Sequence, residues 1–144
     1  MSKTTAEIEE EIIDEFSLFD DYIDLYDYII DIGKETPPID EQYKTDDNLV
    51  KGCQSKVWLH AEYKNGKVMY YADSNTVITK GIVALLTRVL SEQKPDDILN
   101  CELGFLDEIN LRSHLSSQRS NGLSAMIKQM KLYALGFKTK MQQA

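Results

Sequence analysis

The clearest constraint on the fold is a β-hairpin pattern near the middle of the chain. Apolar residues alternate with more polar ones over residues 57–63, and a second apolar run covers residues 68–72. The pair Asn65-Gly66 lies between the two runs. Asn-Gly is the strongest short-range hairpin signal, because both central residues of the tight turn take a positive φ. The sequence therefore predicts an antiparallel hairpin, which needs other elements to cover it because an isolated hairpin is only marginally stable.

Helical periodicity precedes the hairpin. Apolar residues at helical spacing predict one helix over about residues 5–17 and a second from Asp21 to a stop at Gly33. The run Thr36-Pro37-Pro38 makes continuation unfavourable, because proline lacks the amide and clashes with the preceding turn. Residues 34–49 are then a long polar connection, and such connections are usually either functional or disordered.

Two longer helices are expected after the hairpin. Asp73-Ser74-Asn75 offers caps for a third helix, whose apolar face runs from Ile78 to Val89. Gly81 inside this helix either packs closely against another backbone or is tolerated at a cost of roughly 1 kcal/mol. A last helix begins among the serines of residues 116–120, and Gly136 marks its fraying end.

The order of elements predicts an α+β domain. Residues 101–113 show neither helical nor strand periodicity, but a third strand near Cys101–Phe105 would complete a minimal sheet. No internal repeat and no second domain is visible, so residues 1–144 are expected to form a single domain with helices packed on one face of a small antiparallel sheet. The acidic helix at about residues 5–17 is interpreted as an N-terminal extension of that domain.

Charge and composition exclude several classes of function. The length of 144 residues and the ordinary share of hydrophobic residues fit one globular domain. The net charge of −8 repels phosphate backbones, so no nucleic-acid binding is expected. Most of the acidic residues lie in residues 7–47, whereas residues 128–140 are basic. The acidic region is either a solvated helical face or a surface that meets a basic partner.

The compartment follows from what the sequence lacks. The first residues contain no apolar signal-peptide core, and no run is long enough to span a membrane, so a cytoplasmic protein with no membrane association is expected. Two cysteines are too few for a disulfide framework. In a reduced cytoplasm a free thiol persists and can react.

Cys53 is the strongest candidate for chemistry. It lies between Gly52 and the small polar pair Gln54-Ser55, where a loop enters the hairpin. A structural cysteine is usually embedded in an apolar run, and loops on a rigid scaffold are where reactive groups concentrate. The glycine supplies backbone freedom and the polar pair supplies hydrogen-bond donors. The flanking lysines, Lys51 and Lys56, could favour the thiolate, which is the reactive form. The alternative is an inert buried cysteine.

The other polar candidates have ordinary explanations. Cys101 adjoins an apolar segment and reads as core filler. His60 falls on a predicted strand, and the spacing of the histidines and cysteines supports no metal or cluster site. A histidine base for a cysteine protease is not indicated by any spacing. Arg119 lies near a helix start, where a cation is electrostatically misplaced, so it is either solvated or paired with a carboxylate or ligand. Asp73 reads as a helix cap.

Four stretches of the chain resemble the SufE family of sulfur-acceptor proteins, which work with cysteine desulfurases in iron–sulfur cluster assembly. The likeness runs from about Asp21 to Phe137, and the order and spacing of the stretches make it specific. They are Gly52-Cys53-Gln54-Ser55 with Val57-Trp58, then Ala72-Asp73-Ser74 with Ile78, Lys80 and Gly81, then Pro95-Asp96-Asp97-Ile98, and finally His114-Leu115-Ser116 through Arg119, Gly122, Met126 and Ile127.

The resemblance implies roles for individual residues. Cys53 looks like the persulfide-accepting cysteine, and Asp73 and Arg119 match polar positions near its loop. His114 matches a further motif position. The family fold, similar to that of the IscU-like scaffold proteins, is α+β, and in that family the resting cysteine loop tucks into an apolar recess and swings out to meet the desulfurase.

The leading hypothesis is therefore a sulfur carrier that is not itself an enzyme and holds no cofactor or metal. Its implied partners are a pyridoxal-phosphate cysteine desulfurase similar to SufS, which it would stimulate, and a downstream cluster scaffold. One alternative is a non-catalytic adaptor that stimulates the desulfurase allosterically. Another is a cluster scaffold, although that needs about three or four ligands. The oligomeric state, a homodimer among the options, stays open.

Overall fold

The predicted hairpin forms as expected. In this computed structural model, which describes residues 3–143, strand β1 spans Val57–Lys64 and strand β2 spans Lys67–Ser74. The strands pair antiparallel with Leu59 opposite Ala72. Asn65 and Gly66 form the turn with φ values of 53° and 81°, so both adopt the positive φ that this dipeptide favours.

The third strand does not form, and that prediction is wrong. The sheet of the described residues has two strands, and Cys101–Gly104 is an irregular link between α4 (Pro95–Asn100) and α5 (Phe105–Glu108). Leu103 in this link has a φ of 55°, which no strand accommodates. The hairpin edges are instead covered by single bridges, Leu49 to Trp58 and Val68 to Gln93.

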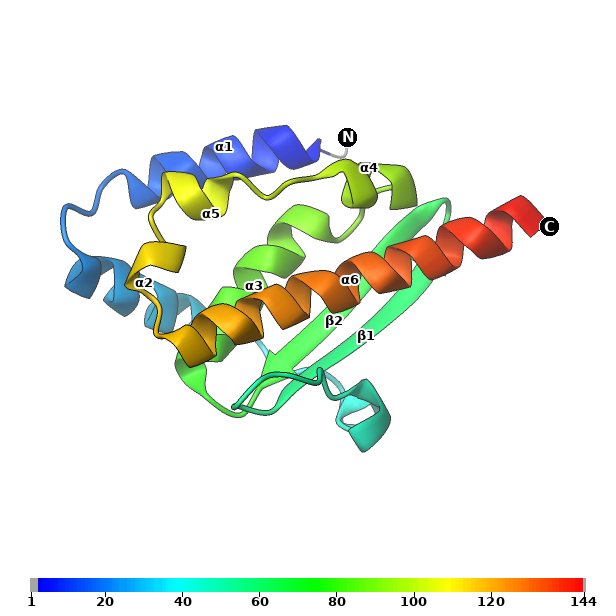
Figure 1. The fold of residues 1–144 in the computed structure, drawn as a ribbon, viewed down its shortest axis with the longest axis horizontal. Helices are drawn as coiled ribbons and strands as arrows, with labels where there is room; N and C mark the ends of the chain where they lie inside the picture. Colours follow the sequence, from blue (N-terminus) through cyan, green and yellow to red (C-terminus); the bar gives the residue numbers. More distant parts are fainter. Residues whose placement is uncertain (1–2, 144) are drawn as a thin grey trace.

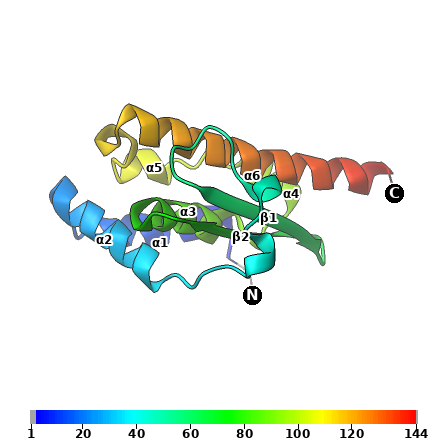
Figure 2. The same cartoon turned by 90° about the horizontal axis from the view of Figure 1, so that it is seen from below.

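Two long helices cover one face of the hairpin, so the predicted α+β architecture is confirmed. Helix α3 spans Val77–Leu90 and packs on β2, while α6 spans Ser117–Gln143 and runs the length of both strands (Figures 1 and 2). Helix α6 therefore continues well past Gly136, where its end was expected. The inward-facing residues of the hairpin alternate along each strand; they are Val57, Leu59, Ala61, Val68 and Tyr70.

The opposite face of the hairpin is covered by the polar connection instead of a helix. This connection contains two short 3-10 turns, η1 (Glu41–Tyr43) and η2 (Asp46–Asn48). The Tyr43 ring stacks on His60 with a centroid separation of 4.1 Å, and the Lys44 ammonium lies over the Trp58 ring. His60 is thus a packed strand residue.

The acidic N-terminal helix is part of the hydrophobic core. Helix α1 spans Thr5–Phe16 and starts at a complete capping box formed by Thr4 and Glu7. Ile12 is fully buried and Phe16 nearly so. Helix α1 packs against α3 and α5, as Figure 1 shows. The helix therefore contributes apolar burial to the fold in addition to its acidic outer face.

Helix α2 crosses α3 at two glycines. It spans Tyr22–Glu35, capped by Asp21, and so runs past Gly33, the position predicted to end it. A Cβ on Gly33 would lie 2.1 Å from the Val77 carbonyl oxygen, and a Cβ on Gly81 would lie 2.1 Å from that of Ile29. Of the two interpretations of Gly81, close packing against another backbone is therefore the right one.

Candidate functional site

The Cys53 loop lies where the polar connection enters β1. The Val50 N–H donates to the Val57 carbonyl at 2.8 Å, which closes the neck of the loop. Gly52 adopts a φ of 93°, a conformation that residues with a Cβ rarely take. This turn directs Cys53 back toward the N-terminal part of α6. The expectation that Gly52 supplies backbone freedom is therefore matched by a conformation that requires glycine.

Cys53 faces a small cavity between its own loop, α3 and α6. The cavity has a volume of about 90 Å³. Ile82 and Met126 are buried and form its apolar floor, while the rest of the lining is mostly polar. The lining residues are Cys53, Gln54, Ser55, Thr79, Ile82, Gln118, Arg119, Gly122 and Met126. Four of the seven predicted site residues, Cys53, Gln54, Ser55 and Arg119, thus lie together, and Gly52 adjoins them.

The resting state of Cys53 is a half-buried thiol. Its Sγ contacts the Gly122 carbonyl oxygen at 3.5 Å as a hydrogen-bond donor. Burial raises the pKa of the Cys53 thiol above its ordinary value. The flanking lysines, Lys51 and Lys56, are exposed and do not reverse that effect. The expectation that these lysines favour the thiolate is therefore wrong for this conformation of the loop, because desolvation of the charged form dominates.

Gly122 is the α6 residue that contacts the Cys53 thiol. A Cβ at this position would lie 3.5 Å from Cys53 Sγ and 3.8 Å from Cys53 Cα. Glycine in the interior of a helix is unfavourable relative to alanine by roughly 1 kcal/mol. Both distances are ordinary van der Waals contacts, so an alanine would also fit here, and the cysteine loop lies directly against this part of α6.

Arg119 brings a positive charge to the rim of the cavity. It lies in the first turn of α6, and its backbone N–H donates to Ser116 Oγ at 3.2 Å. Among residues 3–140, no carboxylate forms an ion pair with its exposed guanidinium. In this part of the chain the Arg119 guanidinium therefore has no carboxylate partner.

Asp73 lies apart from the cavity. It belongs to β2 and is only 2% exposed, and it does not cap α3, whose N-cap is Thr76. Its carboxylate forms ion pairs with Lys80 at 3.3 Å and Lys44 at 3.6 Å. Burial acts to raise the pKa of Asp73, but two backbone N–H groups and Lys80 outweigh it, so the pKa is lowered. The cap interpretation of Asp73 is wrong, and its role at the site stays a prediction.

Asp73→Asn should destabilise the protein by about 3 kcal/mol at neutral pH, near the low end for breaking a buried ion pair because the lysines keep some exposure. The lowered pKa means that this contribution is present above the unfolded pKa of about 3.9 and is lost as pH falls through the folded value. Urea unfolding from pH 7 down to pH 2 should show the variant and the wild type converging in acid. Asp31→Asn, an exposed position on α2, is the control. Equal stabilities of Asp73→Asn and wild type at pH 7 would contradict the structural role.

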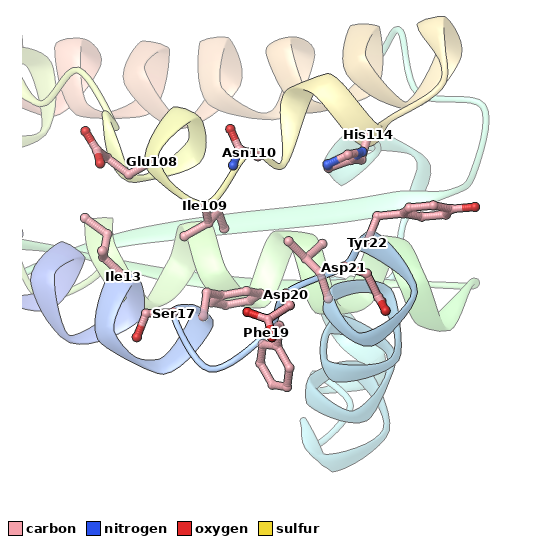
Figure 3. A pocket seen from close by; sticks show the side chains of 12 residues that line it. Ile13, Ser17, Phe19, Asp20, Asp21, Tyr22, Glu108, Ile109, Asn110 and His114 are labelled. Carbon is pink, nitrogen blue, oxygen red and sulfur yellow. The ribbon is translucent and has the colours of Figure 1, made fainter.

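His114 also lies apart from Cys53. It ends η3 (Arg112–His114), and its ring stacks on Tyr22 with a centroid separation of 5.6 Å. Both rings line a different pocket of about 200 Å³ between the α1–α2 turn and α5, shown in Figure 3. The Tyr26 hydroxyl donates to the His114 carbonyl. The structure therefore supports an architectural contact for His114 with the first turns of α2, and its role at the site stays a prediction.

Cys101 is buried beside α1, as predicted for a core cysteine. It is 6% exposed, and its Sγ lies 3.9 Å from a Glu9 carboxylate oxygen. Burial raises the pKa of this thiol as well. Within the described part of the chain, no three side chains of His, Cys, Asp or Glu form a group that could hold a metal ion.

Sequence reasoning missed two polar residues of the cavity, Thr79 and Gln118. Thr79 was hidden in the apolar pattern of a helix, although its hydroxyl is a polar group on a predicted core face. Gln118 stands one residue before Arg119 in a polar segment without any period. Only the meeting of α3 and α6 in the fold brings them to Cys53.

The fold and the site define an α+β protein that presents one thiol to a small, partly polar cavity. Residues 10–134 match the family model SufE, the Fe-S metabolism associated domain. The chain belongs to the SufE family. The match begins inside α1, so the acidic helix lies partly within the family domain. No helix among residues 3–143 is long and apolar enough to cross a membrane.

Similar proteins occur in bacteria and in a plant. An uncharacterized SufE-like protein of Rhizobium meliloti is 36% identical over 132 residues, which cover 88% of this chain and 94% of that protein. A protein of Wigglesworthia glossinidia brevipalpis named cysteine desulfuration protein SufE is 31% identical over 83% of this chain and 84% of its own length. SufE-like protein 1 of Arabidopsis thaliana, chloroplastic/mitochondrial, is 40% identical, and the match spans 31% of its length.

A solved structure shares the fold. The solution structure of a hypothetical protein from Thermus thermophilus superimposes with a TM-score of 0.74 at 19% identity. The match covers 92% of this chain and 96% of that one. At this identity the likeness supports the α+β fold and says nothing further of function.

Proposed function

We propose that this chain accepts a sulfur atom from a pyridoxal-phosphate cysteine desulfurase onto Cys53 and carries it toward iron–sulfur cluster assembly. The observation that carries the proposal is the placement of Cys53, a lone thiol that follows a positive-φ glycine on a loop and faces a small cavity. Membership in the SufE family and a relative named for cysteine desulfuration support a role in sulfur transfer.

The transfer step needs one thiol and no oxidant. The Cys53 thiolate attacks the terminal sulfur of the persulfide on the desulfurase cysteine, and a new S–S bond forms to Cys53. The S–S bond on the desulfurase breaks, and its cysteine leaves as a thiolate. One sulfane sulfur has then moved between two cysteines. The chain turns over nothing by itself and needs no cofactor of its own for this step.

The closed loop suits storage better than attack. Any stray thiol can take the sulfane sulfur from an exposed persulfide. Burial shields the sulfur but raises the thiol pKa, which lowers the thiolate fraction at neutral pH. A carrier therefore needs a second, open position of the loop that the partner binds more tightly.

The function is tested by incubating the chain with a cysteine desulfurase and cysteine and then measuring its intact mass. The expected result is a gain of one sulfur atom, placed on Cys53 by peptide mapping and removed by a reducing agent. A chain that gains no sulfur while the desulfurase turns over would refute the carrier function.

Arg119→Gln should slow sulfur acceptance without unfolding the protein. The guanidinium at the rim of the cavity can stabilise the thiolate or persulfide anion, and a hydrogen bond from a charged donor is worth about 1.5 kcal/mol, or roughly tenfold in rate. The rate of mass gain would be compared with that of Arg112→Gln, a matched change of an exposed arginine outside the cavity. Identical rates for wild type and Arg119→Gln would leave Arg119 a solvated surface residue.

A further inference from the structure

The N-cap residue of α3 directs its hydroxyl at the Cys53 loop instead of at its own helix. A threonine at an N-cap normally accepts a hydrogen bond from a first-turn N–H, which stabilises the helix. Thr76 makes no such bond. Its Oγ1 donates to Ser55 Oγ at 3.1 Å. The helix therefore forgoes a cap, and the hydroxyl contacts the loop that carries the thiol.

A second hydroxyl of α3 reaches the same atom. Thr79 is only 7% exposed, so its hydroxyl is a buried polar group that needs a partner. Its Oγ1 lies 3.5 Å from Ser55 Oγ, beyond the usual O–H···O range of about 2.5–3.0 Å, so this contact is weaker than that of Thr76. Ser55 thus lies between two threonine hydroxyls at the wall of the cavity that Cys53 faces.

The residue after Ser55 is fixed to the rigid scaffold. The Lys56 N–H donates to Asn75 Oδ1 at 3.0 Å, and the Lys56 carbonyl accepts from Ser74 Oγ at 2.8 Å. Together with the closed neck at Val50 and Val57, these bonds limit the part of the loop that can move to residues 51–55. Ser55 is the last residue of that part, so its hydroxyl is the point at which the moving segment meets α3.

We propose that Thr76 and Thr79 hold the Cys53 loop closed through the Ser55 hydroxyl, and that exposure of Cys53 consists of releasing this latch. The inference rests on the proposed function, since a latch matters only if Cys53 leaves its cavity to meet a partner. Ser55 touches no sulfur in this scheme. It is a positioning residue that sets where the thiol lies and how often it is exposed.

The short moving segment also limits how far the thiol travels. Cys53 is the third residue beyond Val50, and an extended chain spans about 3.5 Å per residue, so the cysteine backbone reaches about 10 Å from the neck. The partner must therefore present its persulfide near its own surface or on a segment that comes out to meet this loop.

The latch is tested by the alkylation rate of Cys53 in the free protein, with no desulfurase present. Iodoacetamide labelling would be followed by intact mass in a Cys101→Ser background. Because labelling of a gated thiol follows the open population, Ser55→Ala and the double variant Thr76→Val/Thr79→Val should each label roughly fivefold faster than the parent, the equilibrium change expected for one lost hydrogen bond. The pH midpoint of labelling should move down toward that of an ordinary thiol.

Matched variants separate the latch from general loosening. Thr87→Val removes a hydroxyl from the same helix that bonds only the Val83 carbonyl at 2.8 Å, and it should label like the parent. Ser55→Thr keeps the hydroxyl and should restore slow labelling. Parent-like rates in both latch variants, or an equal acceleration by Thr87→Val, would overturn the latch. Sulfur uptake by the wild type is scored separately, so the latch and the carrier function can fail independently.

Discussion

A Cys53→Ala variant is expected to gain no sulfur from a working cysteine desulfurase, whereas the wild type gains one sulfur atom. The expectation follows from the proposed step, in which the sulfane sulfur ends on the attacking thiol and no second thiol is at hand. Cys53 is half-buried on a loop, so its truncation should cost only about 1 kcal/mol of stability, as is usual for a single substitution. Intact mass after incubation, with a thermal melt of each variant, measures both quantities.

Cys101→Ser is the matched control for this experiment. Cys101 is buried beside α1 and does not line the cavity, so its variant should accept sulfur as the wild type does. Some loss of stability is expected, because a hydroxyl replaces a buried thiol whose environment is mostly apolar. Sulfur recovered on Cys101, or on the Cys53→Ala chain, would show that the acceptor has been misassigned.

The Cys53→Ala variant also distinguishes a sulfur carrier from a non-catalytic adaptor. If the chain stimulates its desulfurase by removing the persulfide, Cys53→Ala should lose the stimulation along with the sulfur. A non-catalytic adaptor acts through binding alone and would keep it. Full stimulation by Cys53→Ala at the same concentration as wild type would therefore favour the adaptor.

The parts of the fold that were predictable are those specified by local sequence. The Asn65-Gly66 turn and the alternating runs beside it determine the hairpin without help from distant residues. The third strand failed because Cys101–Phe105 is apolar enough for a strand, while the positive φ of Leu103 that prevents one has no local signal. The helix end predicted at Gly33 was also wrong. Glycine commonly ends helices, but here it lies inside α2 and allows the close crossing with α3.

The site residues that were predictable are likewise those that local sequence specifies. Cys53, Gln54 and Ser55 are consecutive, so recognising one placed the others. Arg119 lies at the cavity because α6 begins beside the loop. The resemblance predicted this proximity, which depends on tertiary structure, whereas the residues alone did not. The resemblance predicts that Asp73 and His114 match family motif positions, yet their contacts are an ion-pair network and an aromatic stack away from the thiol.

Gly81→Ala should strongly destabilise the protein. The new Cβ would lie 2.1 Å from the Ile29 carbonyl oxygen and 2.8 Å from Ile29 Cγ2, far inside contact distance. Backbone cannot rotate away as a side chain can, so α2 and α3 would have to separate at a crossing where Ile29 is fully buried. We expect a loss of at least about 3 kcal/mol, the upper range for overpacking, and a fall in Tm of roughly 10 °C.

Gly136→Ala is the matched control, and it should change stability in the opposite direction. Gly136 lies within α6 with no atom within 4 Å of the position of an added Cβ. Alanine there gains helix propensity without a clash, which should stabilise the protein by roughly 0.5–1 kcal/mol. Urea unfolding of the two variants compares one chemical change in two environments. If Gly81→Ala left the free energy of unfolding unchanged, α2 could move away from α3 at little cost. The N-terminal helices would then be held to the hairpin and its thiol loop by contacts other than this tight crossing.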